Sequence, residues 1–138
     1  MQSFKSLICS LMVFLVVVHV EMVRSDRSDD GETYIYECYG KDACKDKSIR
    51  CNQQYFDGYM VECDGESACS GNTMIDAGDA VYLKVTCDGK DACKGNTRIY
   101  CPEGLCLLEC WGEKACEDIR VYEQENTQFS CTGNCDDV

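Results

Sequence analysis

Apolar and polar side chains alternate along five short segments of the chain, each of which ends at a cysteine. The alternating triplets are Tyr34/Tyr36/Cys38, Tyr59/Val61/Cys63, Leu83/Val85/Cys87, Cys106/Leu108/Cys110 and Thr127/Phe129/Cys131. The residue directly before each cysteine is polar: Glu37, Glu62, Thr86, Glu109 and Ser130. A period of two is the signature of a strand with one buried face. A shorter apolar pair follows each of the first four segments and predicts a second strand: Ile49/Cys51, Ile75/Ala77, Ile99/Cys101 and Ile119/Val121.

The motif C-x-G-x-x-A-C joins the two predicted strands and occurs four times. The copies start at Cys38, Cys63, Cys87 and Cys110, and a clipped copy starts at Cys131. A unit of about 24 residues with two short strands cannot bury its apolar face alone, whereas stacked units can. We therefore expect an all-β fold, a short disulfide-rich parallel β-helix (β-solenoid) of about four to five coils. A knottin-like or EGF-like array is the alternative, but its cysteine spacing would vary more and would not preserve alternating strands.

The N-terminal segment has the features of a secretory signal peptide. Lys5 provides the positive charge, Leu7 to Val20 is an apolar run, and cleavage is expected after Ser25. The run is short for a membrane anchor, which needs about 20 residues. We thus expect residues 1–25 to be removed, residues 26–31 to form a disordered acidic leader, and residues 32–138 to form the repeat domain of a secreted, extracellular protein.

Composition narrows the possible partners. The chain has 138 residues, 14 cysteines and a net charge of −12. Nucleic acids and anionic membranes attract clustered Lys and Arg, so neither is an expected partner. Such a cysteine content is typical of a disulfide scaffold in an oxidising compartment. Loss of Cys9 with the signal peptide would leave an odd number of cysteines.

One set of disulfides accounts for the odd number of cysteines. In this set, each motif forms a disulfide between its own two cysteines. The pairs would be Cys38–Cys44, Cys63–Cys69, Cys87–Cys93, Cys110–Cys116, Cys101–Cys106 and Cys131–Cys135. Bridges between neighbouring coils remain an alternative, because stacked strands lie about 4.8 Å apart. Cys51 would be the odd thiol. We expect it to be buried rather than nucleophilic, because the only histidine, His19, lies in the signal peptide.

The other repeated positions have structural interpretations. The motif glycines Gly40, Gly65, Gly89, Gly112 and Gly133 suit a left-handed turn. The residue after each of the first four glycines alternates in charge: Lys41, Glu66, Lys90 and Glu113. Neighbouring coils would bring these charges together and so specify the order of stacking.

Two columns contain the candidate functional residues. One holds Glu37 and Glu62, with Glu109 two coils further on, and the other holds Tyr39, Asp64, Asp88, Trp111 and Thr132. Asp64 and Asp88 would be stacked one strand apart, where carboxylates repel unless a cation lies between them. This favours weak Ca²⁺ association or a mineral surface. The competing interpretation is a solvated acidic face that prevents aggregation. Tyr39 and Trp111 would flank the acids and suit a glycan or protein partner.

The C-x-G-x-x-A-C coils resemble those of secreted, Cys-rich β-helical repeat proteins of protists and marine eukaryotes, over about residues 32–135. The architecture also resembles the disulfide-rich solenoid antifreeze proteins of insects, which bind ice through a flat Thr-x-Thr array. Thr73 and Thr97 align here, but no Thr-x-Thr column exists, so ice binding is not expected.

No nucleophile–base pair, metal set or phosphate loop is present, so we do not expect an enzyme or a resident cofactor beyond weak Ca²⁺. The leading expectation is a secreted acidic structural or extracellular-matrix protein. A soluble extracellular binding module is the second, and a secreted toxin or effector the third. The partner could be a mineral, a glycan or a protein. The oligomeric state is left open, since strand edges at the ends of the stack would allow end-to-end dimers.

Overall fold

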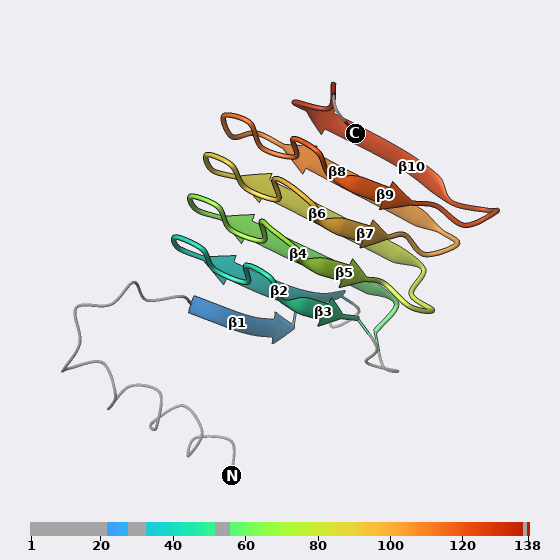
Figure 1. Ribbon diagram of the computed structural model, residues 1–138. Helices are drawn as coiled ribbons and strands as arrows, with labels where there is room; N and C mark the ends of the chain where they lie inside the picture. The colour runs from blue at the N-terminus through green and yellow to red at the C-terminus, as the bar shows by residue number, and fades with distance from the viewer. Residues whose placement is uncertain (1–21, 28–32, 52–55, 137) are drawn as a thin grey trace, which may run out of the picture.

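The computed structural model describes residues 22–27, 33–51, 56–136 and 138. This part of the chain contains ten strands and no helix, and forms a parallel β-solenoid of about four turns (Figure 1). The expected fold class is thereby confirmed.

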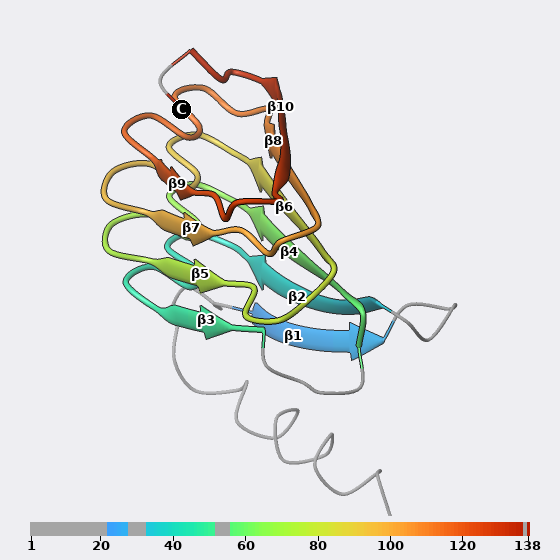
Figure 2. The same ribbon diagram turned by 90° about the vertical axis from the view of Figure 1, so that its right-hand side faces the viewer.

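Two sheets enclose the core, and Figure 2 shows them as two rows of strands. Sheet A has the order β1-β2-β4-β6-β8-β10, and sheet B has the order β3-β5-β7-β9. The strands of sheet A are β1 (Met22–Arg27), β2 (Thr33–Tyr39), β4 (Gly58–Asp64), β6 (Tyr82–Asp88), β8 (Leu105–Cys110) and β10 (Gln128–Gly133). Those of sheet B are β3 (Ser48–Arg50), β5 (Met74–Asp76), β7 (Arg98–Tyr100) and β9 (Arg120–Tyr122).

The first four coils stack in the register that the cysteines predict. Cys38, Cys63, Cys87 and Cys110 lie opposite one another along sheet A. The core-facing positions before them form matching columns, such as Val61 opposite Val85 and Leu108. The core is therefore a set of columns in which each side chain packs on its equivalent in the next coil.

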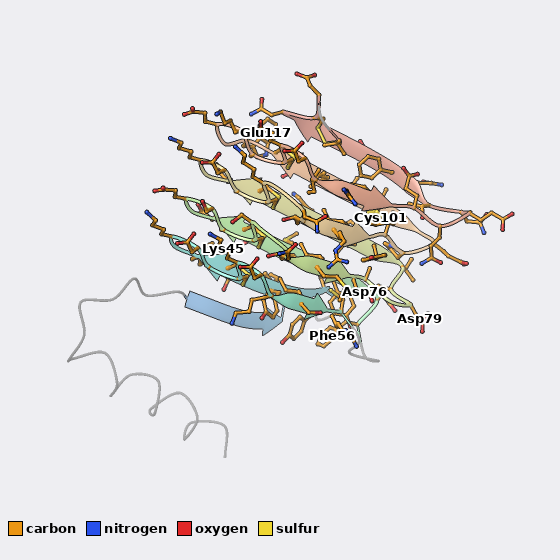
Figure 3. All side chains as sticks on the ribbon, in the orientation of Figure 1. Lys45, Phe56, Asp76, Asp79, Cys101 and Glu117 are labelled. Carbon is orange, nitrogen blue, oxygen red and sulfur yellow. A yellow bond between two sulfur atoms is a disulfide. The ribbon has the colours of Figure 1, made fainter. Side chains whose placement is uncertain are left out.

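Six disulfides brace these coils, and Figure 3 shows them among the side chains. They are Cys38–Cys44, Cys63–Cys69, Cys87–Cys93, Cys101–Cys106, Cys110–Cys116 and Cys131–Cys135. These are the pairs of the local assignment. Five of them close a loop within one coil, and Cys101–Cys106 joins the end of the third coil to the start of the fourth. Cys51 is a buried free thiol. Six disulfides indicate that the protein folds in an oxidising compartment.

The last coil does not have the strand register that is predicted when its first cysteine is aligned with those of the other coils. Cys131 lies opposite Leu108, and Gly133 lies opposite Cys110, so β10 is offset by two residues. The loop before β10 fixes where the strand starts, because Gln128 N–H donates to Gly104 O. From there β10 reaches its cysteine two residues sooner than β8 does. Thr132 therefore lies opposite Glu109, and its predicted place beside Trp111 is wrong.

The fourth coil also departs from the predicted pairing of apolar positions. Val121, not Ile119, continues the column of Ile49, Ile75 and Ile99. The turn after Cys116 is one residue shorter than the turn after Cys93, so Ile119 moves into the place that Thr97 occupies in the third coil.

The strand β1 was not expected. It pairs antiparallel with β2, so that Ser25 lies opposite Tyr36. Asp26 and Arg27 belong to this strand rather than to a disordered leader, and the rest of that predicted leader lies outside the described residues. The same holds for residues 1–21 of the predicted signal peptide. Cleavage after Ser25 would fall inside β1 and leave this edge of β2 unpaired.

The motif glycines are required by the close approach of successive turns. A Cβ atom on Gly89 would lie 2.5 Å from the carbonyl oxygen of Gly65, and one on Gly65 would lie 2.5 Å from that of Gly40. The predicted left-handed conformation is present at Gly40, Gly65, Gly89 and Gly133, with φ of 131° at Gly89. It is wrong for Gly112, whose φ is not positive and which is required by close approach alone. The backbone ladder continues through these turns, since Cys93 N–H donates to Ala68 O.

We expect Gly89→Ala to destabilise the protein far more than Gly95→Ala. Gly95 also has a positive φ of 94°, but its nearest atom to a new Cβ is 3.8 Å away, so it controls for backbone strain alone. Strain should cost about 1 kcal/mol in both variants. The clash in Gly89→Ala should add about 2–3 kcal/mol and lower the melting temperature by roughly a further 10 °C or more. Equal thermal unfolding curves for the two variants would contradict the close-approach argument.

Candidate functional site

The predicted acidic residues converge on the outer face of sheet A. Glu37 lies opposite Glu62 on neighbouring strands, and Asp64 lies opposite Asp88. Tyr39 lies opposite Asp64, at the same end of the strands. We call Glu37, Tyr39, Glu62, Asp64 and Asp88 the acidic face. Their side chains point outward because the cysteines between them, such as Cys63, point into the core.

Four of these residues line one shallow hollow of about 110 Å³. Tyr39, Glu62, Asp64 and Asp88 contribute to it together with Cys63 and Thr86. Glu37 approaches the hollow through Tyr39, to which it is hydrogen-bonded. The structure thus brings together five of the six residues that the sequence assigned to a cation or partner face.

Tyr39 links the two glutamates of the acidic face. Its hydroxyl lies 2.7 Å from Glu62 Oε2 and 3.0 Å from Glu37 Oε1, and its single proton is shared between these two carboxylates. The hydrogen bond to Glu62, followed by burial and the bond to Glu37, raises the pKa of Tyr39 well above its ordinary value. The phenol therefore keeps its proton and offsets the repulsion between two stacked carboxylates.

Asp64 and Asp88 have no such partner. Both are exposed, and no described Lys or Arg forms an ion pair with either. Two adjacent carboxylates can share a hydrated cation whose remaining ligands are water, which is a weak site for Ca²⁺.

Glu109 does not belong to the acidic face. Thr86 separates it from Glu62 in the same column, and Lys84 Nζ forms an ion pair with Glu109 Oε1 at 3.0 Å. The alternating charges of the motif predict ion pairs between neighbouring coils. One such pair is present among the described residues, between Lys41 and Glu66 at 3.5 Å.

Trp111 is the exposed aromatic side chain beside the acidic face. Its backbone N–H donates to Cys87 O, which places it one coil beyond Asp88, and the residue is 53% exposed. Trp111 thus continues the column of Asp64 and Asp88 as predicted, whereas the offset of β10 keeps Thr132 out of this column.

The described cysteines offer no metal centre in the oxidised protein. Among the described residues, two groups of three sulfur atoms are close enough to bind an ion: Cys38, Cys63 and Cys69, and Cys110, Cys131 and Cys135. All six are bonded in disulfides. The free thiol of Cys51 is buried, and burial, with a smaller effect of Asp76, raises its pKa to about 12. Cys51 is therefore a protonated thiol and a poor nucleophile.

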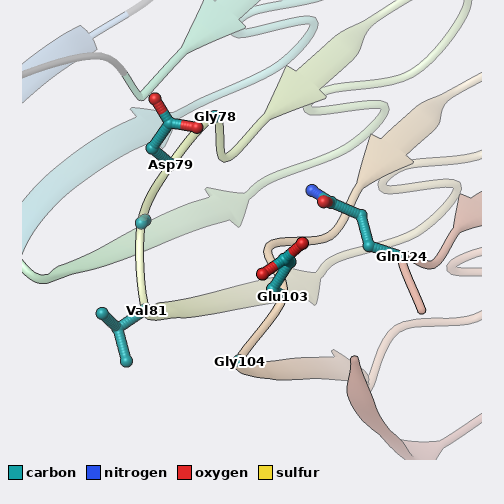
Figure 4. A pocket seen from close by; sticks show the side chains of 7 residues that line it. Gly78, Asp79, Val81, Glu103, Gly104 and Gln124 are labelled. Atoms are coloured by element: carbon teal, nitrogen blue, oxygen red, sulfur yellow. The ribbon is translucent and has the colours of Figure 1, made fainter. Parts of the chain in front are cut away.

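A larger hollow, which was not predicted from the sequence, lies on the loops at the other end of the sheet A strands. It measures about 480 Å³, and Figure 4 shows the side chains that line it. Asp79 and Val81 come from the loop before β6, Glu103 from the loop before β8, and Gln124 from the loop before β10. The sequence does contain an acidic residue in each of two successive loops. Because these loops differ in length, the two acidic residues do not align between the repeats. The hollow is acidic and contains no pair of side chains suited to nucleophilic catalysis.

The aligned threonines lie inside the solenoid. Thr73 and Thr97 are fully buried. The hydroxyl of Thr73 donates to carbonyl groups of the turn, with Cys44 O at 2.9 Å, and the hydroxyl of Thr97 donates to Cys69 O at 2.7 Å. They satisfy buried carbonyl groups and are not part of an outer face that could bind ice.

No helix within the described part of the chain is long and apolar enough to cross a membrane.

The raised pKa of Tyr39 leads to a spectroscopic prediction. Because its phenol remains protonated, Tyr39→Phe should leave the phenolate absorbance gained up to about pH 12 unchanged. Since an unfolded tyrosine ionises near pH 10, Tyr39 stabilises the fold below that pH and loses this contribution as the pH rises further. Absorbance near 295 nm during a rapid alkaline titration measures both proteins. Loss of one phenolate equivalent in the variant would show that Tyr39 is not held by the glutamates.

Comparisons with known proteins found no relative. No family model matches the chain, and neither the curated proteins nor the solved structures contain a match to it.

Proposed function

We propose that the protein is a secreted, non-enzymatic structural component of an extracellular matrix, and that its acidic face associates weakly with Ca²⁺ or a calcium-bearing mineral. The observation that carries the proposal is the stacking of Asp64 on Asp88, both exposed and without a cationic partner among the described residues. The neighbouring glutamates add negative charge, and Tyr39 fixes their position.

The scaffold suits a structural role. Five of the six disulfides are buried in a core that is built from repeated columns. Such a stack needs no further ordering when it contacts a surface, so little conformational entropy is lost on binding. The carboxylates are then presented at the fixed spacing of β-strands, about 4.8 Å.

The proposal predicts a calcium-dependent gain in stability that requires Asp64 and Asp88. At about 10 mM CaCl₂, a site with a dissociation constant near 1 mM should contribute about 1.4 kcal/mol and raise the melting temperature by several degrees. Asp64→Asn/Asp88→Asn should abolish this gain. Glu123→Gln/Glu125→Gln is the matched control, because it removes the same charge from exposed positions outside the acidic face and should retain the gain.

Retention on calcium carbonate and extraction of the native source test the matrix role directly. We expect the parent protein and the control to be retained and the double aspartate variant to be released. An antibody to residues 32–138 should detect the protein in material that only a chelator or acid dissolves. Recovery in soluble secretions alone, or equal melting temperatures with and without calcium, would contradict the proposal.

A soluble extracellular binding module is the second candidate, favoured by the exposed ring of Trp111 beside the acidic face. It predicts saturable binding to a glycan or cell surface in the presence of a chelator, and loss of that binding in Trp111→Ala. Binding that is unaffected by Trp111→Ala would remove the support for this candidate.

A further inference from the structure

The disulfides of the stack differ sharply in exposure. The ten cysteines of the five inner disulfides are each at most 1% exposed. By contrast, Cys131 and Cys135 are only half-buried. The reason is their place in the fold, because β10 is the last strand of sheet A and no strand of the described residues pairs with its outer edge (Figure 1).

Sulfur atoms at both ends of the stack are close together, but only one end is accessible. The sulfur atoms of Cys110, Cys131 and Cys135 lie within 4.8 Å of one another, and so do those of Cys38, Cys63 and Cys69. The second group is fully buried, with β1 paired along the edge of β2 beside it. Proximity of sulfur atoms is therefore common to both ends, whereas access for a reagent is confined to Cys131–Cys135.

We propose that Cys131–Cys135 is a thiol–disulfide exchange site at which an external, low-molecular-weight thiol forms a mixed disulfide with the protein. The thiolate of the reagent attacks one of the two sulfur atoms, for example that of Cys135. A bond forms between the reagent and Cys135, the Cys131–Cys135 bond breaks, and its electron pair leaves on Cys131 as a thiolate. A second molecule of the thiol attacks the mixed disulfide, which reduces the protein cystine to two thiols and oxidises the reagent to its own disulfide.

Burial confines the exchange to this disulfide. The Cys131 thiolate would lie next to Cys110, but attack there must expel Cys116 as a thiolate. Cys116 is 1% exposed, and desolvation disfavours a charged sulfur in such a place. The buried thiol of Cys51 shows the same effect through its raised pKa. The reaction should therefore stop at the last coil instead of passing down the column of disulfides.

Charge selects the class of thiol. Residues 105–138 carry eight acidic and two basic side chains, and Asp136 directly follows Cys135. An anionic thiol is repelled from this end of the stack and a cationic one is attracted. The preferred reagent is thus a cationic thiol such as an aminothiol. This inference is independent of the calcium proposal, because it involves neither Asp64 nor Asp88.

The test uses the full oxidised chain under native conditions. The protein is incubated with cysteamine, 2-mercaptoethanol or 3-mercaptopropionate, then alkylated, and each disulfide is followed by peptide mass mapping. We expect adducts and alkylation at Cys131 and Cys135 at least about tenfold faster than at the cysteines of the five inner disulfides. The rates should fall from the cationic to the neutral to the anionic thiol, and the difference should shrink in high salt.

Two variants separate the site from a general loosening of the fold. Cys131→Ser/Cys135→Ser should lose the fast reaction while the inner disulfides keep their slow rates. Asp136→Asn should reduce the preference for the cationic thiol by about two- to threefold. Asp79→Asn, in the loop between β5 and β6, removes the same charge and should leave the preference unchanged. Earlier opening of an inner disulfide, including Cys38–Cys44 at the opposite end, or equal rates for the three thiols in low salt, would overturn the inference.

Discussion

The fold depends on one constraint: each turn of the motif must lie directly against the turn of the next coil. Ala43, Ala68 and Ala92 accept hydrogen bonds from the second cysteine of the following motif, so the ladder of sheet A continues around the corner. That cysteine adopts a left-handed conformation in all four copies, with φ between 53° and 64°. Each non-glycine residue in this region costs about 1 kcal/mol. A disulfide that closes a loop of this length contributes about 2 kcal/mol and offsets the strain.

Register follows from this constraint. Because the turns contact backbone to backbone, a coil cannot slide by one residue without placing a Cβ atom where the motif glycine lies. The cysteine columns and the columns of Glu37 on Glu62 and Asp64 on Asp88 are consequences of the same stacking. A surface of stacked carboxylates is therefore a product of the repeat itself, and it persists wherever two successive copies have an acid at the same motif position.

The coils, the disulfides and five members of the acidic face could be predicted from the sequence alone. The reason is that the C-x-G-x-x-A-C motif indicates the strand register wherever its spacing is constant. It failed where the spacing changes. Val121 replaced Ile119 in the core column after a turn one residue shorter, and Thr132 left the predicted column because a hydrogen bond at Gln128, not Cys131, sets the register of β10. The strand β1 was missed because Met22–Arg27 carries no motif and pairs antiparallel with β2.

The acidic face depends on which acids the basic residues pair with, and not only on the net negative charge of the chain. Residues 58–81, the second coil, contain five acids and no Lys or Arg. Three basic residues of the coils on either side pair with other acids: Lys41 with Glu66, Lys84 with Glu109, and Lys94 with Glu117 at 2.8 Å. Asp64 and Asp88 form a column with which no basic side chain of the described residues forms an ion pair. A surface that needed only solubility could carry its acids in any column, whereas two acids aligned and unpaired at strand spacing provide the arrangement that a shared cation requires.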